Sequence, residues 1–219
     1  MTLQASQLAY ARGNRKLFAD LNFEVKPGEA LRVAGRNGSG KTSLLRVLCG
    51  LAEPLKGEVL WRGLPARKHR DVFHQDLSYI GHGHGLKDDL SALENVQIGA
   101  VLSGRACTRV QALEALDAVG LKARAHLPVR VLSQGQRRRV LLSRLALASQ
   151  EGQVPRLLVL DEPFVALDQE SVLSLSALLN QQLAQGAVLV YTTHQPPQAL
   201  QASRTHELVL GAGQLAEAV

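Results

Sequence analysis

The segment most informative about this chain reads Gly35-Arg36-Asn37-Gly38-Ser39-Gly40-Lys41-Thr42. It fits the pattern G-x-x-x-x-G-K-[ST], in which glycines let backbone N–H groups turn inward around a phosphate chain. The lysine supplies a positive charge for the β- and γ-phosphates, and the threonine hydroxyl can bind Mg²⁺. Chance agreement with this loose pattern in a chain of 219 residues is on the order of one in a hundred. The segment therefore indicates a nucleotide site, whose expected contacts are Gly35, Arg36, Asn37, Gly38, Ser39, Gly40, Lys41, Thr42 and Ser43.

The residues on either side of this loop have the pattern that a phosphate-binding loop requires. Residues 30–34 read as a short buried strand, although Arg32 interrupts the apolar run. Residues 43–49 read as a helix whose N-terminal dipole faces the bound anion. A strand, a glycine-rich loop and a helix in this order are typical of an α/β protein.

Composition sets the general class of the protein. A chain of 219 residues with 46% hydrophobic content is long enough for one substantial domain. No apolar run approaches the roughly 20 residues needed to span a bilayer, and residues 1–6 have no feature of a secretory signal. Cys49 and Cys107 lack the spacing of metal ligands. We therefore expect both to be buried as small hydrophobic residues, with free thiols in a reducing compartment.

The chain is basic, with 25 Lys and Arg against 19 Asp and Glu and a net charge of +6. Such a charge is compatible with nucleic acid or an anionic membrane surface. Only 4% of the residues are aromatic, which argues against a surface on which bases stack. An arginine-rich solvated surface explains the charge as well, and we expect no nucleic-acid partner.

The order of hydrophobic patterns predicts an α/β core with a helical insert. Strands are expected at residues 3–10, 17–25, 58–63, 77–81, 156–160 and 187–191, and the last two are apolar enough for central parallel strands. Ser91 and Glu94 fit a capping box, residues 110–119 form an amphipathic helix, and Gly120 ends it. We therefore expect one domain over residues 1–219, with its core at about 1–83 and 132–219 and the helical insert at about 84–131.

A second motif is the strand Leu157-Leu158-Val159-Leu160 followed by Asp161 and Glu162. A strand that ends in two acids places carboxylates at the carboxyl edge of the sheet, where the phosphate loop also opens. Asp161 is therefore expected to hold Mg²⁺ with Thr42, and Glu162 to polarise the attacking water. Such acids are often solvated turn residues, but the phosphate loop about 120 residues upstream makes that reading weak.

A third motif, Leu132-Ser133-Gln134-Gly135-Gln136, stands ahead of a predicted helix at residues 140–148. With it the whole chain resembles the ATP-binding cassette (ABC) family, whose signature is LSGGQ; Gln134 departs from that pattern. The resemblance implies a P-loop NTPase fold: a RecA-like core with a mixed sheet, an antiparallel β subdomain and a helical subdomain. It also implies that Ser133, Gly135 and Gln136 bind the γ-phosphate of ATP held by a second copy of the chain, in a head-to-tail dimer. We read the following arginines, 137–139, as a solvated first helical turn.

The same resemblance assigns the remaining elements. Residues 166–168 match the D-loop of the dimer interface, and His194 matches the switch histidine that contacts the γ-phosphate. The expected Q-loop glutamine is missing, since Gln75 lies too early and its place falls on His82 or Gly83; whether His82 replaces it as a polar contact stays open. For the residue that stacks on adenine, Arg12, Tyr10 and Phe18 stay open. Lys41, Glu162 and His194 are thus the expected catalytic residues.

Within the family, several segments are similar to the ATP-binding subunits of cytochrome c maturation exporters, also called haem exporters. These segments are residues 79–87, 90–95, 57–61, 160–164 and 192–196. The resemblance implies a bacterial inner-membrane complex in which two ATPase chains lie on the cytoplasmic face and couple ATP hydrolysis to two membrane-spanning subunits. Whether haem is the cargo stays open. The alternatives are an ATPase of another ABC transporter or, less favoured, an ABC-type ATPase that acts on nucleic acid.

Overall fold

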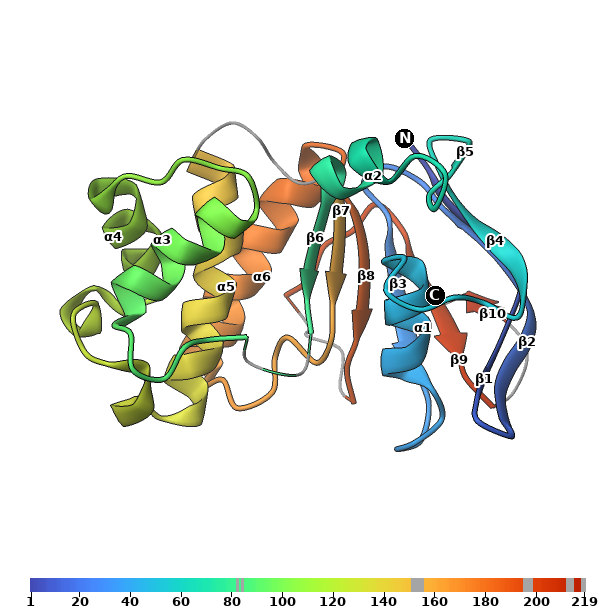
Figure 1. The fold of residues 1–219 in the computed structure, drawn as a ribbon, viewed down its shortest axis with the longest axis horizontal. Coiled ribbons are helices and arrows are strands. Elements are labelled where there is room, and N and C mark those ends of the chain that lie inside the picture. The colour runs from blue at the N-terminus through green and yellow to red at the C-terminus, as the bar shows by residue number, and fades with distance from the viewer. Residues whose placement is uncertain (82, 84, 151–155, 195–198, 212–214, 218–219) are drawn as a thin grey trace.

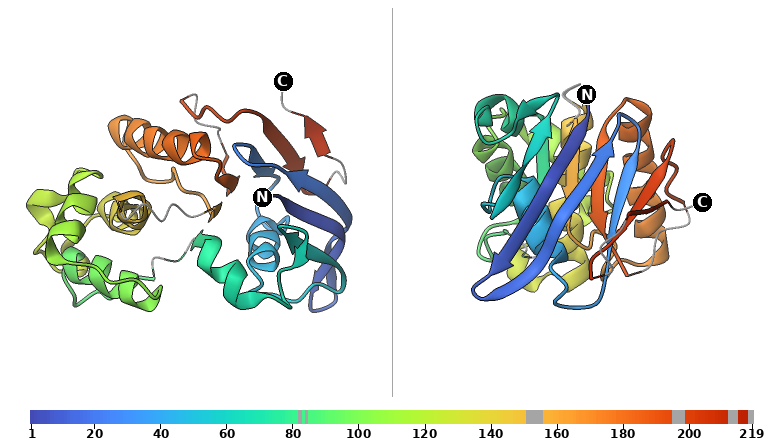
Figure 2. Two further views of the ribbon diagram at one scale, coloured as in Figure 1. Left: turned by 90° about the horizontal axis from the view of Figure 1, so that it is seen from above. Right: turned by 90° about the vertical axis from the view of Figure 1, so that its right-hand side faces the viewer.

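The computed structural model describes residues 1–81, 83, 85–150, 156–194, 199–211 and 215–217. It contains two sheets, a helix between them, and further helices beside the larger sheet (Figure 1). Seen from above, the smaller sheet lies at one end of the molecule and a helical layer at the other (Figure 2). The larger sheet lies between them, and the glycine-rich loop and the two acids follow the carboxyl ends of its strands.

The smaller sheet is antiparallel and has the strand order β2-β1-β4-β5. A register shift in β1 at Gln7, which has a φ of 49°, lets the strand bend around the core. Alternate residues of β1 and β2 face inward, as expected for a sheet with one buried face. Its strands are β1 (Leu3–Arg12), β2 (Arg15–Val25), β4 (Lys56–Trp61) and β5 (Leu64–Pro65).

The larger sheet has the order β10-β9-β3-β8-β7-β6 and is mixed, because β10 is antiparallel to β9 while the other pairs are parallel. All residues of β7 and β8 are buried, which agrees with their continuous apolar sequence. Arg32 is tolerated in β3 because it pairs with Glu207 of β9 at 2.6 Å. The strands are β3 (Ala30–Ala34), β6 (Leu77–Ile80), β7 (Leu157–Leu160), β8 (Val188–Thr192), β9 (Thr205–Val209) and β10 (Leu215–Glu217).

Helices cover both faces of the larger sheet. Helix α1 (Lys41–Leu48) lies between the two sheets and buries Leu44, Leu45 and Leu48 against both of them. Helices α5 (Gln134–Gln150) and α6 (Gln169–Ala184) bury leucines against the opposite face. The short helix α2 (Arg70–Asp76) leads into the edge strand β6. No helix among the described residues is long and apolar enough to cross a membrane.

The helical layer packs around its own apolar cluster. Helix α3 (Ala92–Leu102) begins with the expected capping box of Ser91 and Glu94, and α4 (Arg109–Asp117) begins with a second one at Thr108 and Gln111. Gly120 has a φ of 66° just past α4, as expected of a residue that ends a helix. The 3-10 turns Lys122–Arg124 and Val129–Val131 lead to α5, whose Val140 and Leu147 join this cluster.

The expected strands are confirmed within a few residues, including the parallel neighbours β7 and β8, whereas the helix expected at residues 140–148 begins earlier, at Gln134. Helix α2, β5 and β10 are short elements with little hydrophobic periodicity, and the pattern did not predict them. Helix α6 and strand β9 are also additions to the expected elements. The division of the domain at about residues 83 and 132 stays a prediction.

Candidate active site

The glycine-rich loop connects β3 to α1 at the carboxyl edge of the larger sheet. Gly40 is the N-cap of α1 and has a φ of 103°, a left-handed conformation that a side chain would strain. The Lys41 ammonium donates to the carbonyl oxygen of Gly35 at 2.9 Å, which holds the side chain across the loop. The loop amides, the lysine and the positive end of α1 thus converge on one point, an arrangement suited to a phosphate chain.

Thr42 and Asp161 meet at this edge although 119 positions separate them. The Thr42 hydroxyl donates to Oδ2 of Asp161 at 2.8 Å. The other carboxylate oxygen, Oδ1, accepts from the hydroxyl of Thr192 at the end of β8, at 2.6 Å. Asp161 is 2% exposed, so these hydrogen bonds fix its orientation. The two expected metal ligands therefore lie together.

Glu162 has an unusual backbone and an orphaned carboxylate oxygen. Its φ is 51°, and its N–H donates to the Thr192 hydroxyl at 2.8 Å. One carboxylate oxygen, Oε1, lies 3.4 Å from Nε2 of His194. The other oxygen, Oε2, is buried without a hydrogen-bond partner among the described residues. A buried acceptor without a donor is costly, so this oxygen is suited to receive a hydrogen bond from a water molecule.

These groups line a cleft of about 740 Å³. Arg12 and Arg15 of the antiparallel sheet also line it, whereas the rings of Tyr10 and Phe18 stack on each other with centroids 5.8 Å apart. Of the three residues left open for adenine, Arg12 is thus the one in the cleft. The expected site residues that line the cleft are Asn37, Gly38, Gly40, Lys41, Thr42, Ser43, Asp161, Glu162 and His194, while Gly35, Arg36 and Ser39 belong to the same loop but do not line the cleft.

The signature residues do not line this cleft in the described part of the chain. The Ser133 hydroxyl caps α5 by accepting from the Gln136 N–H at 3.2 Å, and the Gln136 side chain accepts from the Ser133 N–H at 3.0 Å. A Cβ on Gly135 would collide with the carbonyl oxygen of Ala166, so only glycine fits there. The N-terminal ends of α5 and α1 lie at the same edge of the molecule, with strand ends between them (Figure 1).

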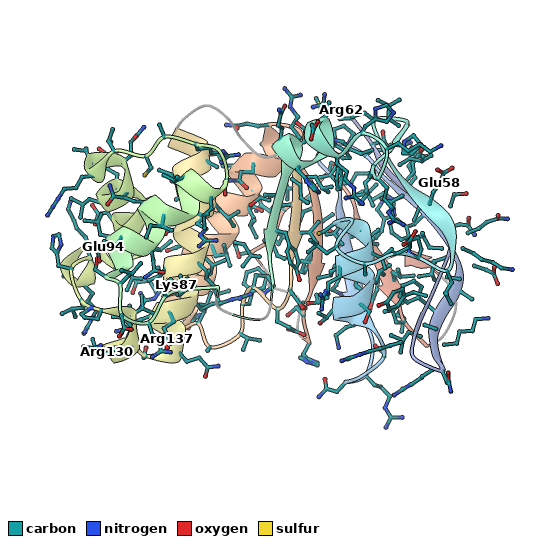
Figure 3. All side chains as sticks on the ribbon, viewed as in Figure 1. Glu58, Arg62, Lys87, Glu94, Arg130 and Arg137 are labelled. Carbon is teal, nitrogen blue, oxygen red and sulfur yellow. The ribbon has the colours of Figure 1, made fainter. Side chains whose placement is uncertain are left out.

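The arginine run after the signature is not a solvated helical turn, and that prediction was wrong. The Arg137 side chain donates to the carbonyl oxygen of Arg130 at 2.8 Å, and the two residues lie together at the end of the helical layer (Figure 3). Arg138 is only 4% exposed, and Arg139 donates to the carbonyl oxygen of Val119 at 3.4 Å. Because carbonyl oxygens accept from these guanidinium groups, Arg138 is buried, and Arg137 and Arg139 are only partly exposed despite their charge.

Two residues of the site escaped sequence reasoning. Thr192 contacts both acids, and Arg138 donates to the carbonyl oxygen of Asp161 at 2.6 Å. In the sequence both residues stand beside a motif, but no role was predicted for either of them. Their contacts join residues more than 20 positions apart, which the sequence alone does not reveal. His82, which stands near the missing Q-loop glutamine, lies outside the described residues, as do residues 195 and 196.

Comparisons with known proteins identify the family of the chain. The model of the ABC transporter family matches residues 18–165. The chain is 45% identical over 208 residues to the "Cytochrome c biogenesis ATP-binding export protein CcmA" of Nitrosomonas europaea, covering 95% of each chain. It is 46% identical over 203 residues to the protein of the same name from Pseudomonas aeruginosa, covering 93% of this chain and 97% of the relative.

Solved structures share the fold. A putative ABC transporter ATP-binding protein from Pyrococcus furiosus superimposes with a TM-score of 0.80 at 21% identity, covering 98% of this chain and all of the other. A dimeric ATP-binding cassette in a post-hydrolysis state, bound to ADP and Pi, superimposes with a TM-score of 0.80 at 24% identity, covering 98% of each chain. The chain therefore belongs to the ABC transporter family, as one of its nucleotide-binding, ATP-hydrolysing subunits.

Proposed function

We propose that this chain is the ATPase subunit of a bacterial inner-membrane complex that serves the biogenesis of c-type cytochromes, with haem export as the candidate transport step. The names of its relatives support this function, because eight of them are cytochrome c biogenesis ATP-binding export proteins at 43–47% identity. The single observation that carries the ATPase mechanism is the convergence of Lys41, Asp161 and Glu162 on one cleft.

In this proposal ATP lies in the cleft with its phosphates against Lys41 and the amides of residues 38–43. A volume of about 740 Å³ falls within the usual range of small-molecule sites. Arg12 lines the cleft, so its guanidinium plane can stack on the adenine ring. Lys41 places its charge where negative charge accumulates during transfer of the γ-phosphoryl group.

Thr42 and Asp161 would hold Mg²⁺. Their facing oxygens are of the type that this ion prefers, and the hydrogen bond between them brings the two oxygens within 2.8 Å. When bound, the ion would neutralise charge on the β- and γ-phosphate oxygens. Thr192 keeps the Asp161 carboxylate in place through its own hydrogen bond.

Glu162 orients the attacking water in this mechanism. Its free oxygen Oε2 accepts a hydrogen bond from the water, while the backbone contact with Thr192 holds the residue in its left-handed conformation. His194 lies beside the other oxygen, with its side chain 59% exposed toward the open cleft. An exposed imidazole at this position can donate a hydrogen bond to the γ-phosphate.

The site is completed by a second copy of the chain. Ser133, Gly135 and Gln136 stand at the start of α5, outside the cleft of their own chain, with backbone amides at a helix N-terminus. We propose that two copies meet head to tail, so that these residues close on the ATP held by the partner copy. Closure would exclude water from the γ-phosphate and couple hydrolysis to movement of the complex.

The membrane-spanning partner would contact a second cleft, of about 1340 Å³, between the edge strand β6 and the helical layer. Arg144 of α5 lies in this cleft against Gly99 of α3, where a Cβ would come within 2.7 Å of the guanidinium. Burial lowers the pKa of Arg144, and the group has no hydrogen bond or ion pair within the described chain. An acidic side chain of the membrane subunit would supply the missing partner. This contact keeps the ATPase on the cytoplasmic face of the membrane.

The function is tested in the bacterium that carries the gene. Replacement of the chromosomal copy with K41A should abolish the covalent haem of c-type cytochromes, measured by haem staining of gels. A tagged wild-type chain should copurify from detergent-solubilised membranes with a membrane-spanning subunit, identified by mass spectrometry. Normal c-type cytochromes in the K41A strain would contradict the assignment, and an intact ATPase with another transporter's subunit bound would favour the alternative.

A further inference from the structure

Arg138 joins three parts of the chain through one buried side chain. It lies in the second turn of α5 and is 4% exposed. Its Nη1 donates to the carbonyl oxygen of Gly81, just past β6, at 3.0 Å. Its Nη2 donates to the carbonyl oxygen of Asp161, just past β7, at 2.6 Å. A single guanidinium therefore spans the carboxyl ends of two neighbouring strands and the signature helix.

A guanidinium in this position is costly and specific. Burial lowers the pKa of Arg138, although the nearby charges of Asp161 and Glu162 oppose this effect. Its Nε has no hydrogen-bond partner among the described residues. A lysine has a single ammonium group and lacks the rigid fork that reaches two acceptors at once. The position thus requires the two-pronged shape of arginine as well as its charge.

The joined segments belong to two different ATP sites in the proposed dimer. The start of α5 carries Ser133 and Gly135, which face the nucleotide of the partner copy. Asp161 and Glu162 act on the nucleotide of their own chain. Arg138 connects these two sets within one chain, because its guanidinium donates a hydrogen bond to the backbone carbonyl oxygen of Asp161 and the backbone of α5 connects it to the signature. Gly81 begins the connection between the sheet and the helical layer.

We infer that Arg138 is a positioning residue that couples the two ATP sites of the dimer, by moving the signature segment together with the Asp161–Glu162 segment of the same chain. This inference rests on the proposed head-to-tail dimer. Closure of the signature on one nucleotide then shifts the acids at the other, and the two sites hydrolyse ATP cooperatively. Two coupled sites give a Hill coefficient between about 1 and 2.

A structural role in α5 alone is the competing explanation, and Arg137 provides the matched control. Arg137 lies on the same helix and donates to the carbonyl oxygens of Leu132 and Arg130, at 3.1 and 2.8 Å. These contacts stay within the helical layer and none of them reaches the sheet. Arg137 also pairs with Asp88 at 3.4 Å, so the R137M variant removes three hydrogen bonds without touching the link to Asp161.

The experiment measures ATP hydrolysis as a function of ATP concentration for wild type, R138M, R138K and R137M. We expect R138M and R138K to lower the Hill coefficient toward 1 and kcat by about tenfold or more, since a displaced catalytic group reacts slowly. Nucleotide affinity, measured with a fluorescent ATP analogue, should stay within about twofold of wild type, since Arg138 does not line the cleft. R137M should keep the wild-type Hill coefficient.

R138K is the deciding variant if R138M does not fold, because it keeps the buried charge and one hydrogen bond. A wild-type Hill coefficient in folded R138K would overturn the inference, and so would an equal loss of cooperativity in R137M. ATP-dependent dimer formation by E162Q is tested separately. Failure of E162Q to dimerise would refute the dimer itself, whereas a dimer with unchanged cooperativity in R138K would refute only the role of Arg138.

Discussion

The Thr192 hydroxyl donates a 2.6 Å hydrogen bond to Oδ1 of Asp161, and neither residue is more than 2% exposed. The same hydroxyl accepts from the N–H of Glu162 at 2.8 Å. One side chain at the end of β8 therefore fixes both acids at the end of β7. This arrangement explains how Glu162 is held in a left-handed conformation that non-glycine residues rarely adopt.

The substitution T192V tests this arrangement. Valine has nearly the same shape but leaves the Glu162 N–H without an acceptor, which should lower the free energy of unfolding by about 1–3 kcal/mol. Misplaced acids should lower kcat about 10²-fold, measured by phosphate release. T192S keeps the hydroxyl and should retain most of the activity. Equal kcat values for T192V and T192S would contradict the role of this hydroxyl.

His194 should affect turnover more than binding. Its imidazole is 3.4 Å from Glu162 and lines the cleft, where it can donate to the γ-phosphate in the transition state. We expect H194A to lower kcat about 10²-fold and to change nucleotide affinity little. The control is H126A, which removes an exposed histidine of the helical layer. If H194A and H126A had the same kcat, the assignment of His194 would fail.

The capping box of α3 predicts a pH dependence of stability. Hydrogen bonds from the Ser91 hydroxyl and then from its N–H hold the pKa of Glu94 below its ordinary value. The carboxylate thus stabilises the fold above its unfolded pKa, and this contribution is lost as the pH falls through the lower folded pKa. The free energy of unfolding, measured with urea, should fall less for E94Q than for wild type between about pH 5 and pH 3.

The control for this prediction is E114Q, at an exposed glutamate of α4 that caps no helix. Its loss of stability with acid should match that of wild type. Identical pH profiles for E94Q and wild type would show that the Glu94 cap does not contribute.

The two cysteines should differ in reactivity. Cys49 is 0% exposed behind α1, and burial raises the pKa of its thiol, so the reactive thiolate is scarce in the folded chain. Cys107 lies partly exposed before α4, so the expectation that both cysteines are buried was wrong for Cys107. Iodoacetamide should label Cys107 in the native protein and Cys49 only after unfolding, as mass spectrometry can measure. Rapid labelling of native C107S would contradict the packing of α1.

The sequence was sufficient where neighbours along the chain determine the geometry. The glycines before Lys41, the acids after the apolar strand and the Ser91–Glu94 cap are local patterns, and the structure bears out the elements that they predict. Thr192 and Arg138 depend instead on which strands become neighbours in the sheet. The prediction for the arginine run was wrong for the same reason. Its hydrogen-bond acceptors are backbone carbonyl oxygens, which every residue has, so the sequence does not show which of them lie near the arginines.

The central claim is that two copies of the chain share their ATP sites, and trapping of the E162Q dimer tests it most directly. E162Q should bind ATP and not hydrolyse it, and light scattering during gel filtration should give twice the mass of one chain with ATP and Mg²⁺. The double variant E162Q/G135A should stay monomeric, because a Cβ at residue 135 collides with the backbone of Ala166 and displaces the signature. A monomeric E162Q with ATP bound, or hydrolysis by E162Q at the wild-type rate, would contradict the account.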